Sequence, residues 1–165
     1  RAVLDPGAIA AAREEEPGRR LSCLVLGTND LLKETRARSV PGRAPLVAWL
    51  SATVAAGRAY GLDVLDGVFN GLDDEAGFAA ECAQGRDLGM DGKTLIHPRQ
   101  IATANATFGP SEAEVASARA IVAAFERPEN RGKGVLVVDG RMVERLHAEA
   151  ASRVLALAEA IAARG

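Results

Sequence analysis

One aspartate and one histidine each follow a short apolar run that predicts a β-strand, and both could take part in chemistry. Asp30 belongs to the segment Leu26-Gly27-Thr28-Asn29-Asp30-Leu31, and His97 belongs to Gly92-Lys93-Thr94-Leu95-Ile96-His97-Pro98. A carboxylate just past the end of a strand, on a turn that glycine opens and that leads into helical sequence, lies where α/β barrels keep their catalytic groups. The pattern therefore indicates part of an enzyme.

Asp30 is the strongest candidate for a metal ligand. Gly27 permits close approach of the backbone, and the amides of Asn29 and Asp30 begin a short helical run, where exposed N–H groups bind anions. A carboxylate beside such donors suits Mg²⁺, which prefers oxygen ligands and takes one or two protein carboxylates together with waters and substrate oxygens. The alternative interpretation is that Asp30 only caps the helix.

The segment around His97 leaves two interpretations open. His97 could donate to a substrate phosphate or carbonyl, or it could only fix the geometry of the loop. Pro98 is expected at the first position of the helix that follows, where proline is favoured. Lys93 either binds a phosphate or is solvated.

Two further groups of ionisable residues have a structural alternative to chemistry. Asp66, Asp73 and Asp74 could form a carboxylate cluster, but the last two are better explained as residues that start a helix. Glu144 and His147 lie three residues apart and so on one face of the last predicted helix. A surface or interface role is the alternative for this pair.

The elements that must position these groups alternate between strand and helix. Short β-type apolar runs alternate with amphipathic segments of helical spacing, an order typical of right-handed βαβ crossovers and a parallel sheet. The cysteine-containing first run, with almost no polar alternation, predicts a strand buried on both faces. Strands are expected over 21–26, 63–69 and 93–96, and helices over 8–16, 44–60, 74–89 and 100–108.

Three strands are too few to close a (β/α)₈ barrel, which needs at least about 200 residues. Either the sheet is open and doubly wound, or the chain is the later part of a barrel whose opening strands are missing. The fold class expected is α/β in both cases.

The character of the sequence changes near residue 110, so we expect two domains, 1–110 and 111–165. Ser111-Glu112-Ala113-Glu114 has the pattern of a capping box for a helix that runs to Phe125. A polar linker, 127–134, leads to a hairpin around Asp139-Gly140. A last helix over 144–163 carries an apolar stripe, which is usual for core or for a subunit contact.

Composition excludes several classes of protein. The 165 residues carry a formal charge of -2, with 20 Lys and Arg against 22 Asp and Glu; these charges are interspersed, so no basic stripe points to nucleic acid. The apolar stretches are too short for a membrane span of about 20 residues, and no signal-peptide pattern is present. Cys23 and Cys82 lack metal-ligand spacing and are expected to be small buried hydrophobes, which favours a reducing, cytoplasmic setting.

Five motifs in order resemble the citrate lyase beta-subunit-like CoA-ester lyases of the HpcH/HpaI aldolase family, and the resemblance covers nearly the whole chain. Two of them are the Asp30 and His97 segments, the latter extended to Arg99-Gln100-Ile101. The other three are Asp66-Gly67-Val68-Phe69-Asn70, Gly85-Arg86-Asp87-Leu88-Gly89 and Asp139-Gly140-Arg141-Met142-Val143-Glu144.

This resemblance implies a TIM barrel of which the chain supplies the last three strands, followed by a C-terminal helical lid. The missing five strands would carry the family's substrate-carboxylate arginine and its second Mg²⁺-binding glutamate. By resemblance, Asp30 is the remaining metal ligand and the turn Gly27, Thr28, Asn29 and Asp30 offers amides to a 2-oxo acid carboxylate. Ile96, His97 and Pro98 resemble the wall of the CoA channel.

In relatives a carboxylate on the lid reaches a neighbouring subunit's active site, and Glu144 occupies that place here, where several relatives have aspartate. The resemblance thus implies a homo-oligomer, a trimer or hexamer, whose lids are exchanged between subunits. Glu144 is the candidate acid or base.

The reaction that the resemblance implies is cleavage, or formation, of the C2–C3 bond of a 3-hydroxyacyl-CoA of the citryl, malyl or citramalyl type. A 2-oxo acid leaves and an acyl-CoA enolate remains, whose charge must be stabilised. Two alternatives are a 2-oxo-acid aldolase that needs no CoA and a non-catalytic barrel fragment that needs a partner chain. With half of the metal site absent, the isolated chain is expected to be inactive.

Overall fold

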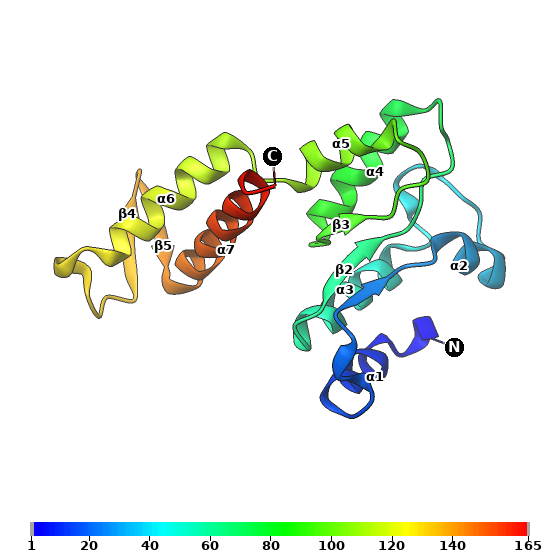
Figure 1. Cartoon of the computed structure of the whole chain (residues 1–165), viewed down its shortest axis with the longest axis horizontal. Coiled ribbons are helices and arrows are strands. Elements are labelled where there is room, and N and C mark those ends of the chain that lie inside the picture. Colours follow the sequence, from blue (N-terminus) through cyan, green and yellow to red (C-terminus); the bar gives the residue numbers. More distant parts are fainter. Residues whose placement is uncertain (1, 165) are drawn as a thin grey trace. The chain divides into compact units, whose positions relative to one another are not determined.

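The computed structural model describes residues 2–164 and divides into two compact units, Arg1–Phe108 and Gly109–Gly165 (Figure 1). The first unit holds a three-stranded parallel sheet with helices, and the second holds two helices and a β-hairpin. The fold class is therefore α/β, as the strand and helix alternation predicts.

The sheet of the first unit has the strand order β1-β2-β3. Its strands are β1 (Cys23–Val25), β2 (Asp63–Asp66) and β3 (Gly92–Lys93), each parallel to its neighbour. All three strands are shorter than predicted. The third strand was expected over 93–96. Thr94 still donates its N–H to the Asp66 carbonyl (3.0 Å), but the chain then leaves the sheet. The N–H of Ile96 donates to the Gln100 side chain (3.0 Å) instead of to a neighbouring strand.

The first unit also contains five α-helices, and local residues explain where two of them begin. Asp5 accepts from the N–H of Ala8 (2.9 Å) at the start of α1, and Asp74 accepts from the N–H of Gly77 (2.9 Å) at the start of α4. Both are caps of the expected kind, which confirms the helix-start interpretation of Asp74. The helices are α1 (Pro6–Ala11), α2 (Thr28–Thr35), α3 (Val47–Ala59), α4 (Glu75–Asp87) and α5 (Gln100–Phe108).

Several predicted helix boundaries differ from the structure. The helix expected over 8–16 is α only to Ala11 and continues as a 3-10 turn, Ala12–Glu14. The helix expected from residue 44 begins at Val47, since Pro45 lies in the turn that precedes it. Pro98 was expected at the first position of α5 but lies two residues before it, in a turn where its carbonyl accepts from Ile101 (3.1 Å).

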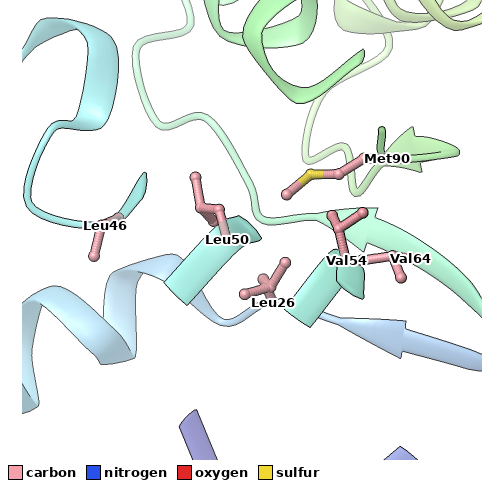
Figure 2. Close-up of a cluster of buried hydrophobic side chains, with 6 residues drawn as sticks. All are labelled: Leu26, Leu46, Leu50, Val54, Val64 and Met90. Carbon is pink, nitrogen blue, oxygen red and sulfur yellow. The ribbon is translucent and has the colours of Figure 1, made fainter. Parts of the chain in front are cut away.

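The main core lies where α3 packs against β1 and β2, and Figure 2 shows its six buried side chains. Val54 of α3 lies beside Val64 of β2, and Leu50 of α3 and Leu26, just after β1, belong to the same cluster. Gly57 allows this close approach, because a Cβ there would lie 2.3 Å from a Val64 methyl carbon. The cluster consists of Leu26, Leu46, Leu50, Val54, Val64 and Met90.

The core therefore fixes the carboxyl ends of β1 and β2 against one rigid helix. A second cluster, Phe78, Cys82 and Ala104, joins α4 to α5 and contacts Phe69 and Leu95 from the loops that follow β2 and β3. Because these loops carry the candidate site residues, helix packing sets where the loops lie.

The second unit contains α6 (Glu112–Glu126), a 3-10 turn (Pro128–Asn130), strands β4 (Val135–Val138) and β5 (Arg141–Glu144), and α7 (Arg145–Ala162). Ser111 and Glu114 form the predicted capping box. The two strands pair antiparallel around Asp139 and Gly140, both at positive φ, which confirms the predicted hairpin. Helices α6 and α7 pack side by side (Figure 1).

Candidate functional site

The turn after β1 places Asp30 in the first turn of α2 with its side chain exposed. The N-cap residue is Gly27, and no side chain forms a capping hydrogen bond at this helix start. The interpretation of Asp30 as the helix cap is therefore wrong. Gly27 leaves space beside the carboxylate, since a Cβ there would lie 3.3 Å from Asp30 Oδ2. Within residues 2–164 no hydrogen bond or ion pair engages the Asp30 side chain. Its carboxylate is therefore available to a ligand.

Thr28 and Asn29, on the same turn, differ in environment. Thr28 is buried, at 5% exposure, while Asn29 is exposed. Thr28 lies against Gly67, the first residue after β2: a Cβ at Gly67 would stand 2.3 Å from Thr28 Oγ1 and 2.7 Å from the Leu26 carbonyl oxygen. Only glycine lets the two strand ends approach so closely. The α2 start, with amides that have no partner inside the helix, is thus held by β2.

Asn29 is also joined to the loop after β2. Its Nδ2 donates to Asn70 Oδ1 (3.2 Å), and Asn70 Nδ2 donates back to Asn29 Oδ1 (2.8 Å). Asn70 was not among the predicted site residues, although it ends the Asp66-Gly67-Val68-Phe69-Asn70 motif. The signal that could have identified it is its place just after a strand neighbouring that of Asn29.

A cavity of about 400 Å³ opens beside this amide pair. Its wall is formed by the turn after β1, the loop after β2, the segment between α2 and α3, and one face of α4. Thr28, Asn29 and Asn70 line it, whereas Asp30 and the His97 loop are not in its lining. The other polar side chains at its wall are Arg38, Ser39, Arg43, Asp74, Glu81 and Gln84.

Four charged side chains form a network at this cavity, to whose wall Arg43 and Glu81 belong. Arg43 Nη1 donates to both Asp66 oxygens (2.7 Å each), and Lys93 Nζ donates to Asp66 (2.9 Å) and to Glu81 (2.6 Å). The Asp66 and Lys93 side chains are 0% exposed. Two cations and two anions balance, as burial of charge requires. Both interpretations of Lys93, phosphate binding and solvation, are therefore wrong.

This network also separates the carboxylates that the sequence groups together. Asp66 is buried, whereas Asp73 is 95% exposed and pairs with Arg99 at 3.4 Å. Arg43 is held at a positive φ of 53°, a strained conformation for a residue with a side chain. Its pairing with Asp66 stabilises that conformation and fixes the segment that lines the cavity.

In the loop after β3, His97 Nδ1 accepts from the N–H of Arg99 (3.2 Å), a contact that fixes the loop. Gln100, another residue not singled out, donates to the Phe69 carbonyl (3.0 Å) and accepts from Ile96. Ile96 is 52% exposed. The segment Ile96, His97 and Pro98 is thus anchored to the loop after β2, with its apolar side chain exposed.

Glu144 lies in the second unit as the last residue of β5 and the N-cap of α7, not inside the helix as predicted. Its backbone N–H donates to His147 Nδ1 (2.9 Å). The prediction that Glu144 and His147 are neighbours is confirmed, and the contact involves the Glu144 main chain.

The cysteines are not positioned for chemistry. Cys82 is fully buried and burial raises the pKa of its thiol; burial also raises the pKa of Cys23, which is half-buried. Raised values keep both as thiols, the less nucleophilic form.

Residues 2–164 contain no group of three His, Cys, Asp or Glu side chains that could hold a metal ion by itself. Asp30 fits a site to which this chain gives one carboxylate, with substrate oxygens, waters and other groups giving the rest. No helix in the same range is long and apolar enough to cross a membrane.

The chain is similar to known proteins in both sequence and structure. The model of the HpcH/HpaI aldolase/citrate lyase family matches residues 1–98. A (3S)-malyl-CoA thioesterase of Cereibacter sphaeroides is 55% identical over 144 residues, 87% of this chain and 50% of that protein. Citrate lyase subunit beta of Leuconostoc mesenteroides subsp. cremoris is 34% identical over 154 residues, 93% of this chain and 51% of that protein.

Among solved structures, CitE from Mycobacterium tuberculosis, in complex with magnesium, acetoacetate and coenzyme A, superposes with a TM-score of 0.69 at 27% identity. The match covers 94% of this chain and 58% of that one. The chain spans about half the length of the curated relatives that it matches.

Proposed function

Because this chain belongs to the HpcH/HpaI aldolase/citrate lyase family, we propose that the full-length enzyme cleaves or forms a carbon–carbon bond in a CoA thioester. The substrate is a 3-hydroxyacyl-CoA of the citryl, malyl or citramalyl type, and the products are an acyl-CoA and a 2-oxo acid. The observation that carries the proposal is Asp30, an exposed carboxylate without a partner in the described residues, at the carboxyl end of β1.

Asp30 is the residue of this chain that holds Mg²⁺ in the proposal. The ion, when bound, polarises the carbonyl of the 2-oxo acid. The turn Gly27, Thr28, Asn29 and Asp30 orients the substrate, since amides at a helix start attract a carboxylate. The CitE structure with magnesium and coenzyme A supports this assignment, as a relative of similar fold.

The other site residues have proposed roles in binding and proton transfer. Ile96, His97 and Pro98 form a wall of the CoA channel, and the exposed Ile96 side chain suits an apolar stretch of the cofactor arm. Glu144 moves the proton. In cleavage a base takes the proton of the C3 hydroxyl, whose oxygen becomes the carbonyl of the 2-oxo acid, and the electrons of the C2–C3 bond pass to the acyl-CoA fragment as an enolate. Glu144 then donates a proton to this enolate, and in condensation it removes the same proton.

The proposed architecture is the later part of a (β/α)₈ barrel, residues 1–110, followed by a lid and oligomerisation extension, residues 111–165. The three parallel strands and the half-length match to the relatives support it. In this arrangement the lid of one subunit serves the active site of its neighbour within a homo-oligomer. This chain alone is then inactive, since it holds only part of the metal site.

A second candidate is hydrolysis of the thioester, favoured by the 55% identity to a (3S)-malyl-CoA thioesterase. The two reactions break different bonds. Cleavage of malyl-CoA breaks a carbon–carbon bond and gives acetyl-CoA and glyoxylate, whereas hydrolysis adds water across the carbon–sulfur bond and gives malate and free CoA.

The test incubates the full-length enzyme with (3S)-malyl-CoA and Mg²⁺ and separates the products by liquid chromatography. Acetyl-CoA with an equal amount of glyoxylate is the expected result. Malate and free CoA without glyoxylate would favour hydrolysis. Turnover of a hydroxylated 2-oxo acid without any CoA would favour the CoA-independent aldolase, and no turnover of either substrate would favour the non-catalytic subunit. Clear turnover by residues 1–165 alone would refute their expected inactivity.

A further inference from the structure

At the junction between β5 and α7, a histidine forms a capping hydrogen bond that another residue type usually makes. A capping box normally has Glu or Gln as the third helical residue, whose side chain reaches back to the N–H of the N-cap. Here the third residue is His147, and its Nδ1 accepts from the N–H of Glu144 at 2.9 Å. The imidazole ring takes the place of the usual carboxylate or amide.

This hydrogen bond selects one tautomer of the ring. An imidazole nitrogen accepts only when it carries no proton, so the contact requires a ring whose hydrogen is on Nε2. The imidazolium form has two donors and no acceptor and cannot make the contact.

The residues on either side of Glu144 are also held in place. The N–H of Arg145 donates to the Gly134 carbonyl (3.3 Å), at the start of the hairpin. Val143, the residue before Glu144, is buried against the unit at 7% exposure. Glu144 therefore has its backbone fixed by both neighbours and by His147, while its side chain is half-buried.

We propose that His147 is a positioning residue for Glu144: it fixes the Glu144 backbone, and thereby the direction in which the carboxylate leaves the hairpin. This inference rests on the proposed role of Glu144 in proton transfer. A fixed backbone removes one source of spread in the positions of the Glu144 oxygens, and correct orientation of a proton donor contributes directly to the rate.

The first experiment examines the ring without reference to activity. The full-length enzyme, labelled with ¹⁵N-histidine, is studied by NMR at a pH where the ring is neutral, and the His147 signals are assigned by their absence in His147→Gln. A clear Nε2–H tautomer is expected. An Nδ1–H tautomer, or an equal mixture of the two, would overturn the proposal.

The second experiment separates positioning from folding. We expect His147→Ala to lower kcat about tenfold or more with little change in KM, and His147→Gln, whose amide oxygen can accept the same N–H, to restore most of it. Glu149→Ala, an exposed residue of the same helix, is the matched control and keeps wild-type kcat. Thermal midpoints of all three variants show whether each is folded.

The outcomes distinguish this inference from the function on which it rests. If Glu144→Gln lowers kcat strongly but His147→Ala, folded, does not, the positioning role is wrong and the proton-transfer role stands. If Glu144→Gln keeps full activity, the proposed role of Glu144 is wrong, and the positioning role fails with it even where the Nε2–H tautomer is found.

Discussion

Arg43 and Asp66, 23 residues apart in the sequence, form a two-pronged ion pair in which Nη1 lies 2.7 Å from each carboxylate oxygen. Asp66 ends β2 and is completely buried, and Lys93 at the end of β3 also donates to it, at 2.9 Å. The ion pair joins the segment between α2 and α3, which lines the cavity, to the end of β2. It is therefore both a stability element and a determinant of the site's shape.

Replacement of Asp66 by Asn should destabilise the protein strongly. Two buried cations would remain with one carboxylate, and breaking a buried ion pair by removing one partner costs about 3–5 kcal/mol. Urea unfolding followed by circular dichroism measures the loss. Asp73→Asn, in an almost fully exposed pair with Arg99, is the control and should leave the midpoint unchanged; equal midpoints for both variants would contradict the structural role of the network.

Asp30→Asn should remove activity while leaving the fold intact. The carboxylate makes no contact in the described residues that folding would lose, but a metal ion held by it supplies several kcal/mol to the reaction. We expect kcat to fall about 100-fold or more, and a chelator to abolish the wild-type activity until Mg²⁺ is restored. Wild-type kcat in Asp30→Asn, with Asp73→Asn as the matched surface control, would remove Asp30 from the mechanism.

Asn70→Asp tests the amide pair that joins the turns after β1 and β2. An aspartate can still accept from Asn29, but it cannot donate the 2.8 Å hydrogen bond to Asn29 Oδ1, and it brings a negative charge to the cavity wall. We expect kcat/KM to fall about tenfold, because the turn that orients the substrate is less well fixed. Steady-state kinetics measure the change, with Asn105→Asp on the exposed face of α5 as the control. Unchanged kinetics would show that the pair does not position the turn.

Gly67→Ala should destabilise the protein through a steric clash. The new methyl carbon would lie 2.3 Å from Thr28 Oγ1, 2.8 Å from Thr28 Cγ2 and 2.7 Å from the Leu26 carbonyl oxygen. Overpacking of this kind costs about 1–3 kcal/mol. Differential scanning calorimetry gives the shift. Gly134→Ala, where a Cβ meets nothing within 4 Å, should unfold at the wild-type temperature or slightly above it. A wild-type midpoint for Gly67→Ala would mean that the strand ends separate easily.

We expect the free energy of unfolding to depend on pH because of the buried thiol of Cys82. Burial raises the pKa of its thiol above the ordinary value of 9.0, so the unfolded chain loses the proton first and the stabilisation, fully present below pH 9, declines as pH rises through the folded-state pKa. Unfolding free energies of the wild type and Cys82→Ala, measured between pH 8 and pH 10.5, should differ in slope, with the wild type falling more steeply above pH 9. Parallel curves would show that the thiol titrates alike in both states.

Local patterns predicted a large part of this fold. The caps at Asp74 and Ser111, the hairpin at Asp139 and Gly140, and the alternation of strands and helices all depend on residues within a few positions of one another. Propensity, capping and turn chemistry act over that range. The errors in strand length come from contacts outside it, such as the Gln100 side chain that takes the N–H of Ile96.

The candidate site was predictable as a set of strand-end residues but not as a set of contacts. The sequence by itself determined that Asp30 and Asn70 follow strands, and that Glu144 and His147 stand next to each other at a helix start. Only the tertiary structure decided that Lys93 is buried against Asp66, that Asn70 pairs with Asn29, and that Arg43 pairs with Asp66 at the cavity wall. The physical reason is that these partners lie 23 to 41 residues apart, and which of them meet depends on the order of strands in the sheet and on how α3 and α4 pack against it.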